Sequence, residues 1–266
     1  MNYINFPNID PYIIRFGDLG ITWYSLSYVT GILLGWQYGN WLINNKYTKS
    51  KITTEQLDNF VTWVILAVII GGRLGHVFLY ELSYYLSNPG EILKTYKGGM
   101  SFHGGLIGVI LATYIFSIFY KLNFLKLGDF LAQTIPFGLF LGRIANFINA
   151  ELYGYKTEMP WGVVFPGTDN AARHPTQIYE ALLEGLVLFF ILYYFSIIKN
   201  YYNQKGFLSG IFLLFYGIFR SFVELFKIPD DFIFGINSGQ FYSLPMIFCG
   251  TFLIIYSYGN RNRINK

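Results

Sequence analysis

The sequence predicts an all-α membrane protein with about seven hydrophobic helices. Of its 266 residues, 53% are hydrophobic and 13% are charged, whereas a soluble domain usually carries roughly 25% charged residues. A soluble chain of this composition would expose a large apolar surface. The apolar runs are also long enough to cross a bilayer, which takes roughly 20 residues.

The apolar runs define seven predicted spans within a single membrane domain, residues 1–266. The fourth run contains Pro136, which a buried helix tolerates when neighbouring groups bind the freed backbone. Glycines four residues apart, such as Gly71 and Gly75, lie on one helix face and predict close helix contacts. The predicted spans lie near residues 22–43, 57–80, 99–120, 127–149, 175–198, 207–227 and 238–258.

The segment before the first span contains Pro7, Asp10 and Pro11 and has no basic region followed by an apolar core. We therefore expect no cleavable signal peptide, and we expect the first helix to direct membrane insertion. Cys249 is the one cysteine in the sequence, so no internal disulfide can form. Since no Cys/His spacing typical of a metal site occurs either, we predict no metal site.

The distribution of Lys and Arg predicts the orientation of the chain in the membrane. If the N-terminus lies outside, the inner segments hold ten basic residues and the outer segments hold six. The inner residues are Lys46, Lys49, Lys51, Lys121, Lys126, Lys199, Lys205, Arg261, Arg263 and Lys266, and the outer ones are Arg15, Lys94, Lys97, Lys156, Arg173 and Lys227. The bias predicts an outer N-terminus and a cytoplasmic C-terminus, and the net charge of +4 is not a nucleic-acid signal.

Six charged residues lie inside the predicted spans, and three are basic and three acidic. Each would cost roughly 3 kcal/mol or more facing lipid at the centre of a span, so we expect them to face the protein interior. They are Arg73, Arg143, Arg220, Glu180, Glu184 and Glu224.

In the predicted orientation these charges gather in the outer half of the membrane. The three arginines come late in outward-running helices, while His103 and Glu180 come early in inward-running ones. Glu151 and His174 lie in or beside the long outer connection 150–174. This grouping favours a functional site. The structural alternative is a set of ion pairs that lock the helices, such as Arg220 with Glu224 at i, i+4.

The residue types in this group suit an anionic phosphate substrate. Arginines offer fixed, bidentate donors for phosphate oxygens. Histidine as a residue type can accept or relay a proton near neutral pH, which makes His103 a candidate, although a lone membrane histidine can also be structural. Glycines in the segment 98–105 allow a backbone to approach a substrate closely.

Several motifs resemble the bacterial prolipoprotein diacylglyceryl transferase family. The segment 142–154, Gly-Arg-Ile-Ala-Asn-Phe-Ile-Asn-Ala-Glu-Leu-Tyr-Gly, resembles the family signature. Further matches, in an order that also fits, are Met100 to Gly105, Trp23-Tyr24, Gly71 to Gly75, His174 to Ala181, and Tyr216 to Arg220 through Glu224. The resemblance covers nearly the whole chain. Its departures are Ala145 and Ala150 for glycine, Tyr153 for tryptophan, Tyr155 for a basic residue and Ser25 for glycine, and we expect them to alter packing around the lipid at most.

The resemblance implies an enzyme of the bacterial inner membrane with seven helices and a site toward the periplasm. It would transfer the diacylglyceryl group of phosphatidylglycerol to the lipobox cysteine thiol of a preprolipoprotein. The products would be a thioether-linked prolipoprotein and glycerol phosphate. The resemblance implies no metal and no organic cofactor.

Within this family reading, we expect Arg143 and Arg220 to clamp the phosphate and His103 to act as base, with Tyr216 as its partner. Headgroup binding is the competing role for His103. We expect Asn146 to bind the headgroup or to orient Arg143. The further substrate-binding candidates are Glu151, Tyr24, Arg73, Gly99, Gly104, Gly154, His174 and Glu224. Glu151 would hold an arginine or the outer loop, and a hydrogen-bond network at the helix end is the alternative for it.

Two other functions use the same features. A transporter or channel for an anionic solute would bind its substrate with the same arginines, but the sequence shows no internal repeat of the kind many transporters carry. An intramembrane protease is a third interpretation. The sequence lacks the His-Glu-x-x-His pattern, and the segment 235–239 misplaces its serine for a Gly-x-Ser-x-Gly elbow.

Overall fold

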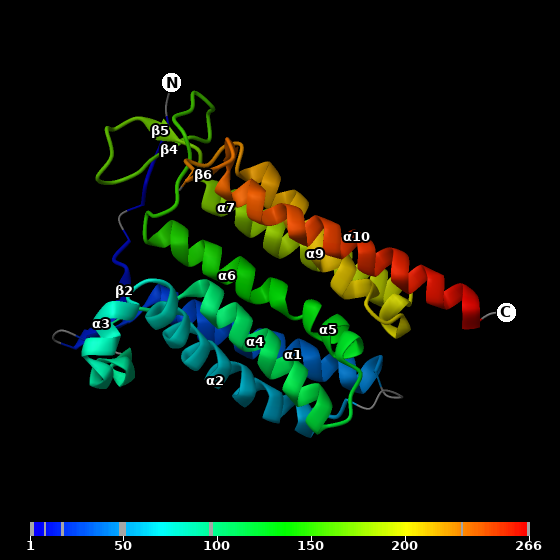
Figure 1. The fold of residues 1–266 in the computed structure, drawn as a ribbon. Helices are drawn as coiled ribbons and strands as arrows, with labels where there is room; N and C mark the ends of the chain where they lie inside the picture. Colours follow the sequence, from blue (N-terminus) through cyan, green and yellow to red (C-terminus); the bar gives the residue numbers. More distant parts are fainter. Residues whose placement is uncertain are drawn as a thin grey trace. The chain divides into compact units, whose positions relative to one another are not determined.

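The computed structural model describes residues 3–7, 9–16, 19–47, 52–95, 98–229 and 231–264. Helices make up most of this part of the chain (Figure 1). Lys49, one of the basic residues that support the predicted orientation, lies outside the described residues.

Each of the seven predicted spans coincides with a helical segment. The fourth is divided into two helices, and the fifth contains two π-helical stretches, η3 and η4. The segments are α1 (Trp23–Asn45), α2 (Thr54–Leu79), α4 (Phe102–Phe119), α5 (Phe124–Ala132) with α6 (Ile135–Ile148), α7 (Thr176–Glu180) continued by η3 (Ala181–Val187), α8 (Leu188–Tyr193) and η4 (Tyr194–Ile198), α9 (Phe207–Val223), and α10 (Ser238–Ile264). Shorter helices are α3 (Leu82–Ser87), η1 (Pro89–Leu93) and η5 (Tyr201–Asn203).

Among the described residues, four helical segments are long and apolar enough to cross a membrane: Thr54–Leu79, Phe102–Phe119, Thr176–Ile198 and Ser238–Gly259. The pair α5 and α6, bent by 43°, can form a fifth span. The bend fits the predicted interruption, because Pro136 lies in the first turn of α6, where a missing N–H costs little. The apolar helix α9 has only 17 residues. The structure is thus that of a polytopic membrane protein, and seven spans stay a prediction.

The chain forms two compact units, residues 1–39 with 129–266 and residues 40–128. In the 40–128 unit, α2 packs against α4 through glycines. A Cβ on Gly71 would lie 2.5 Å from the carbonyl oxygen of Gly104. This contact confirms the close helix packing that the glycine spacing predicts.

In the other unit, α6 packs against η3, and α9 lies beside α10 (Figure 1). A core of Leu188, Leu192, Phe207, Leu208 and Ile211 fills the space between α8 and the start of α9. The two helices α6 and α9 carry the two arginines of the predicted clamp, so this unit positions both of them.

Short strands add to the predicted all-α fold. They are β1 (Ile4–Asn5), β2 (Tyr12–Phe16), β3 (Leu19–Thr22), β4 (Val163–Val164), β5 (Ala172–Arg173), β6 (Phe232–Ile233) and β7 (Ile236–Asn237). Strand β1 pairs in parallel with β4, which pairs antiparallel with β5, while β2–β3 and β6–β7 are hairpins. Most of these strands have two residues, too few for an alternating pattern to appear in the sequence.

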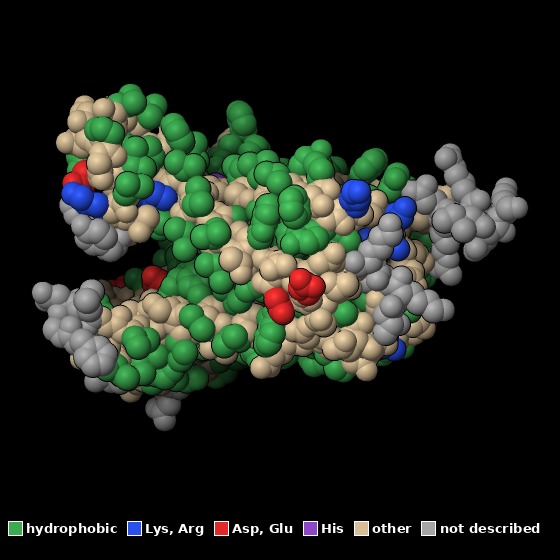
Figure 2. Space-filling model, turned by 90° about the horizontal axis from the view of Figure 1, so that it is seen from below, with side chains coloured by type: hydrophobic (Ala, Val, Ile, Leu, Met, Phe, Trp, Pro, Cys, Tyr) green, Lys and Arg blue, Asp and Glu red, His purple; other side chains and the backbone are tan. Residues whose placement is uncertain are grey.

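The surface has the composition of a lipid-facing one. In Figure 2 hydrophobic side chains cover much of the visible face, and Lys, Arg, Asp and Glu are few. Large side chains on the apolar helices are exposed, including Phe78 at 61% and Phe248 at 71%. Patches of this extent on a soluble protein would favour association, whereas in a bilayer they contact lipid.

Candidate functional site

Two arginines from different helices contact the same two glutamates. Arg143 of α6 places Nη1 at 3.2 Å from Glu180 Oε2 and Nη2 at 3.2 Å from Glu184 Oε2. Arg220 of α9 binds Glu180 Oε1 through Nη1, which also lies 3.9 Å from Glu184 Oε1. Its Nη2 contacts Glu224 Oε1 at 2.7 Å. The structure therefore brings together five of the six intramembrane charges, including the predicted i, i+4 pair.

Lys227 completes this set, which we call the arginine–glutamate cluster (Arg143, Glu180, Glu184, Arg220, Glu224 and Lys227). Its Nζ lies 3.7 Å from Glu180 Oε1 and 3.9 Å from Glu224 Oε1. Three cations therefore face three carboxylates. Pairing of this kind offsets the free-energy cost of burying each charge. Removal of one partner would leave an uncompensated buried charge and destabilise the fold.

The two sides of the cluster differ in exposure. The side chains of Glu180 and Glu184 are completely buried, whereas the Arg143 and Arg220 side chains are each 17% exposed. The carboxylates are thus enclosed, whereas each arginine side chain keeps a small accessible surface. An arginine fixed in this way is suited to bind an anion with its remaining N–H groups.

Glycines make the close approaches that form the cluster. A Cβ on Gly185 would lie 2.6 Å from Phe140 Cβ, so the bare glycine lets α6 approach η3 three residues before Arg143. A Cβ on Gly239 would lie 2.3 Å from the Glu224 carboxyl group. The π-helical segment η3 carries Glu184, and π-helical turns inside α-helices are frequent at functional sites.

Tyr216 and His103, the predicted acid–base partners, lie in different compact units. Tyr216 lies one turn before Arg220 and within electrostatic range of Glu184 and Arg143. His103 is exposed in the first turn of α4, in the 40–128 unit. The pairing of these two residues stays a prediction.

The end of α6 carries a hydrogen-bond network. Asn146 donates from Nδ2 to Glu151 Oε1 at 2.7 Å, and Asn149 Nδ2 lies 3.5 Å from the same oxygen. The buried Gln177 side chain donates to the backbone carbonyl of Glu151. This is the network considered as the alternative for Glu151, and it places Asn146 one turn after Arg143.

Tyr24 reaches this region from α1. Its hydroxyl accepts a hydrogen bond from Tyr28 at 3.3 Å. Tyr28 in turn lies within electrostatic range of Arg143 and Glu151. Tyr24, a predicted substrate-binding residue, is therefore linked to the charged groups through Tyr28.

Gly154 and His174 join the 150–174 connection to the cluster. The Gly154 N–H donates to the His174 carbonyl at 2.8 Å, and Gly154 pairs with Lys227 in an antiparallel bridge. A Cβ on Gly154 would lie 2.2 Å from the Phe226 carbonyl oxygen. His174 Nδ1 lies 3.0 Å from the Tyr179 hydroxyl. Burial lowers the pKa of His174 from its ordinary value, which favours the neutral ring.

Arg73 differs from the other two arginines. It is 5% exposed, and its donors bind backbone carbonyls: Nε that of Ile92 at 2.8 Å, Nη2 that of Glu91 at 2.6 Å, and Nη1 those of Gly98 and Gly99. Four of its five N–H groups are engaged in this way if each donates once. The structure thus gives Arg73 the role of holding η1 and the two glycines that follow it, Gly98 and Gly99.

Gly99 and Gly104 also have structural roles in the 40–128 unit. Gly99 has φ of +78°, and a Cβ there would lie 2.7 Å from the His76 ring and 2.8 Å from Arg73 Nη1. Gly104 packs against Gly75 of α2, where a Cβ would approach within 2.6 Å. These contacts explain the glycine at each of the two positions, and no ligand is needed for the explanation.

Known proteins of one family are similar to this chain over nearly its whole length. The model of the family described as prolipoprotein diacylglyceryl transferase matches residues 11–256. The chain belongs to this family. The phosphatidylglycerol–prolipoprotein diacylglyceryl transferase of Rickettsia felis is 52% identical over 258 residues, which cover 96% of this chain and 99% of that protein. The Rickettsia bellii protein of the same name is 53% identical over 256 residues, covering 95% and 97%.

In this member of the prolipoprotein diacylglyceryl transferase family, the arginine–glutamate cluster contains two residues that are absent from the site predicted from the sequence. Lys227 was assigned to an outer loop, although its position three residues after Glu224 was a usable signal. Glu184 was recognised as an intramembrane charge but not as a site residue. Its contact with both arginines appears only in three dimensions.

The family match covers most of both compact units. Within the ranges that the structure describes, no group of three or more His, Cys, Asp or Glu side chains could hold a metal ion.

Proposed function

We propose that this chain transfers the diacylglyceryl group of phosphatidylglycerol to the lipobox cysteine of preprolipoproteins. The reaction forms a thioether and releases glycerol phosphate, and the names of the Rickettsia relatives support both substrates. The observation that carries the proposal is the arginine–glutamate cluster, in which Arg143 and Arg220 share two buried glutamates while their own side chains remain 17% exposed.

In the proposed reaction a cysteine thiolate attacks the glyceryl carbon that bears the phosphate ester. The sulfur–carbon bond forms as the carbon–oxygen bond breaks, and the electron pair of that bond stays on the phosphate oxygen. Negative charge therefore builds on the departing phosphate. Arginine N–H groups fixed in advance stabilise such charge in a site of low dielectric, which is often the largest catalytic contribution.

The cluster's own carboxylates balance its cations. The phosphodiester substrate brings one negative charge, and the phosphomonoester product gains a second. Because the cluster carries no excess positive charge, it binds the phosphate through directed N–H groups. The product is then not retained by a large net charge, which favours its release.

The thiol must lose its proton before it can attack, since the thiolate is the nucleophile. His103 is the proposed base, with Tyr216 as a partner. The competing role for His103 is headgroup binding, with the thiol deprotonated by water or by the field of the arginines. A histidine at neutral pH can accept this proton without a cofactor.

We further propose that residues 1–266 form a single domain of the bacterial inner membrane with seven spans. The N-terminus and the arginine–glutamate cluster would face the periplasmic side, and the C-terminus the cytoplasm. The ten-to-six bias of basic residues supports this orientation. The partners in this arrangement are phosphatidylglycerol, the signal peptides of preprolipoproteins and the bilayer.

A reconstituted assay tests the reaction. The purified protein in phosphatidylglycerol vesicles receives a lipobox peptide, and the peptide mass is followed. We expect a gain of one diacylglyceryl group, and no gain when serine replaces the peptide cysteine. An unchanged mass together with glycerol phosphate flux across the vesicle membrane would favour the anion transporter, and peptide cleavage would favour the protease.

Cysteine labelling tests the orientation. In a Cys249→Ser background, Asp169→Cys should react with an impermeant maleimide in spheroplasts. Lys205→Cys should react only after lysis. Asp169 is a suitable position because it is 43% exposed. The opposite labelling pattern would contradict the proposed topology. The argument that the intramembrane charges share the outer half of the membrane would fail with it.

A further inference from the structure

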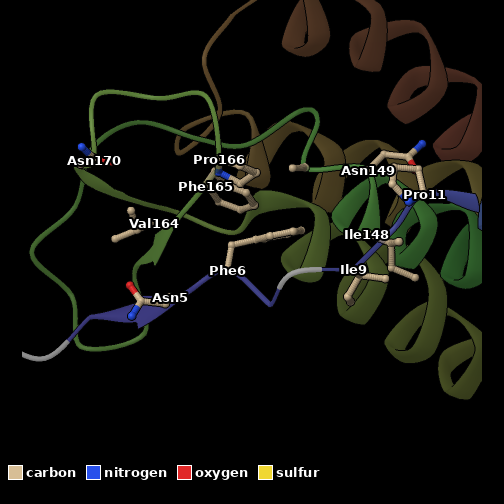
Figure 3. A pocket seen from close by; sticks show the side chains of 11 residues that line it. Asn5, Phe6, Ile9, Pro11, Ile148, Asn149, Val164, Phe165, Pro166 and Asn170 are labelled. Carbon is tan, nitrogen blue, oxygen red and sulfur yellow. The ribbon is translucent and has the colours of Figure 1, made fainter.

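A cavity of about 430 Å³ lies beside the end of α6, at a place that the proposed chemistry does not use. Figure 3 shows the side chains that line it, which come from the N-terminal segment, the end of α6, and β4 with the segment that follows it. Its volume is within the range of ligand-binding clefts. All of its lining residues belong to the same compact unit as the arginine–glutamate cluster.

The lining of this cavity is uncharged and of two kinds. Asn5, Asn149 and Asn170 contribute carboxamides, while Phe6 and Phe165, with ring centroids 5.5 Å apart, contribute apolar surface. A carboxamide both donates and accepts hydrogen bonds, as a peptide group does. An anionic headgroup would need cations, and acyl chains would need a wholly apolar lining. The combination of carboxamides and apolar rings in the lining fits an extended polypeptide main chain.

Asn149 offers an acceptor for such a ligand. Its Oδ1 is buried and has no hydrogen-bond partner among the described residues. Buried polar atoms nearly always have a partner, so an unmatched one calls for an explanation. A turn of the Asn149 side chain that brings Oδ1 to the cavity would let this atom accept a peptide N–H.

The same residue connects the cavity to the helix that carries Arg143. Asn149 Nδ2 lies 3.5 Å from Glu151 Oε1, the oxygen that also accepts from Asn146. Asn149 comes six residues after Arg143 in the sequence, which corresponds to about 9 Å along a helix. An extended chain covers that distance with about three residues.

We propose that this cavity binds the first few residues after the lipobox cysteine of the prolipoprotein substrate, as an extended main chain. The inference rests on the proposed function, because it needs the cysteine to react at the arginine–glutamate cluster. Recognition is through main-chain hydrogen bonds and apolar contact, so it tolerates different side chains in this part of the substrate.

A series of peptides tests the proposal. One lipobox peptide ends at the cysteine as an amide, and the others extend it by three or six uncharged residues. For the unmodified protein we expect kcat/KM to rise about tenfold from zero to three residues, as one or two new hydrogen bonds would give. We expect little further change at six. A kcat/KM that does not depend on the extension would overturn the proposal.

Two adjacent residues provide a matched pair of variants. Asn5 and Ile4 are both exposed in strand β1, and only Asn5 lines the cavity. Successive strand residues point to opposite faces, so Asn5→Trp fills the cavity and Ile4→Trp does not. The measured quantity is the ratio of kcat/KM for the three-residue extension to that for the shortest peptide, within each variant. This ratio is independent of the amount of folded protein.

We expect a ratio near ten for the unmodified protein and for Ile4→Trp, and a ratio near one for Asn5→Trp. Retention of the high ratio in Asn5→Trp would overturn the proposal, as would its loss in both variants. Absence of transfer to any peptide is a different result, since it contradicts the proposed function itself.

Discussion

The two ends of α9 both carry buried charged groups, but the groups are bound in different ways. At the first turn of α9, Asp129 of α5 is 1% exposed. Its Oδ2 accepts from the Gly206 N–H at 2.6 Å, and its Oδ1 accepts from the Ser209 N–H at 2.8 Å and from the Ser209 hydroxyl at 2.9 Å. The carboxylate thus binds groups that the start of a helix leaves without partners.

At the other end of α9, Arg220 and Glu224 join side chains from α6, α7 and η3. Here the charges compensate one another, and the two arginines remain partly exposed. The difference teaches how to separate a structural charge from a functional one in an apolar protein. A charge that is saturated by backbone groups and fully enclosed stabilises the fold, whereas a compensated cluster with an accessible edge can bind a ligand.

The largest effect is expected from the arginines of the cluster. Arg143→Lys and Arg220→Lys keep the charge but lose the paired donor geometry. We expect turnover to fall at least about 100-fold, as when a donor that stabilises transition-state charge is removed. Initial rates in the peptide assay measure this. Arg173→Lys is the control, because Arg173 pairs with Asp169 outside the cluster. Full activity in either cluster variant would remove the clamp from the mechanism.

The second prediction concerns His103. Loss of a general base typically costs roughly 100- to 10,000-fold, so His103→Gln should be severely impaired at pH 7. The activity should partly recover as the pH rises toward the thiol pKa of about 8.5, where the thiolate forms without a base. His76→Gln is the control in the same compact unit. A deficit that stays constant across this pH range would assign His103 to headgroup binding, and an unchanged turnover would exclude both roles.

The third prediction concerns the network at the end of α6. Asn146→Ala and Glu151→Gln disturb a hydrogen bond one turn from Arg143 without removing the arginine. We expect turnover to fall about tenfold, the cost of roughly one hydrogen bond to a charged group. Membrane protein levels should stay near normal. If quantitative blotting shows that both variants lose only abundance, the network is structural and belongs with Asp129 in the comparison.

The comparison also shows what the sequence could predict. Long apolar runs are local signals, and each of the seven predicted segments is helical in the structure. The cost of a charge in lipid likewise identifies five of the six members of the cluster from the sequence, all except Lys227. Both inferences depend on residue type and position alone.

Other features depend on contacts between distant segments. Arg73 was expected in the site, but its donors bind the carbonyls of residues 91–99, which no local pattern reveals. The role of Asp129 requires Gly206 and Ser209 to fold back onto it, which no local pattern in the sequence reveals. Position 239 needs a glycine because the Glu224 carboxyl group occupies the space that a Cβ would take.

The smallest effect on chemistry is expected at Asp129. Asp129→Ala removes the acceptor of three hydrogen bonds and leaves buried N–H groups at the start of α9 without a partner. We expect a loss of about 2 kcal/mol in stability, the usual cost of an unsatisfied buried donor. The midpoint of thermal unfolding in detergent should fall. Turnover per folded molecule should stay unchanged, because the cluster lies at the opposite end of α9, about 25 Å away for 17 residues.

Asp129→Asn sharpens this test, because the amide keeps one acceptor oxygen and should recover part of the lost stability. Turnover is compared after active molecules are counted by binding of a fluorescent phosphatidylglycerol analogue, so that lost protein is not mistaken for lost chemistry. Asp129→Ala could instead stay folded and lose as much turnover as Arg220→Lys. Burial and binding by backbone groups would then not separate a structural charge from a functional one in this protein. The two ends of α9 would then act as one functional element.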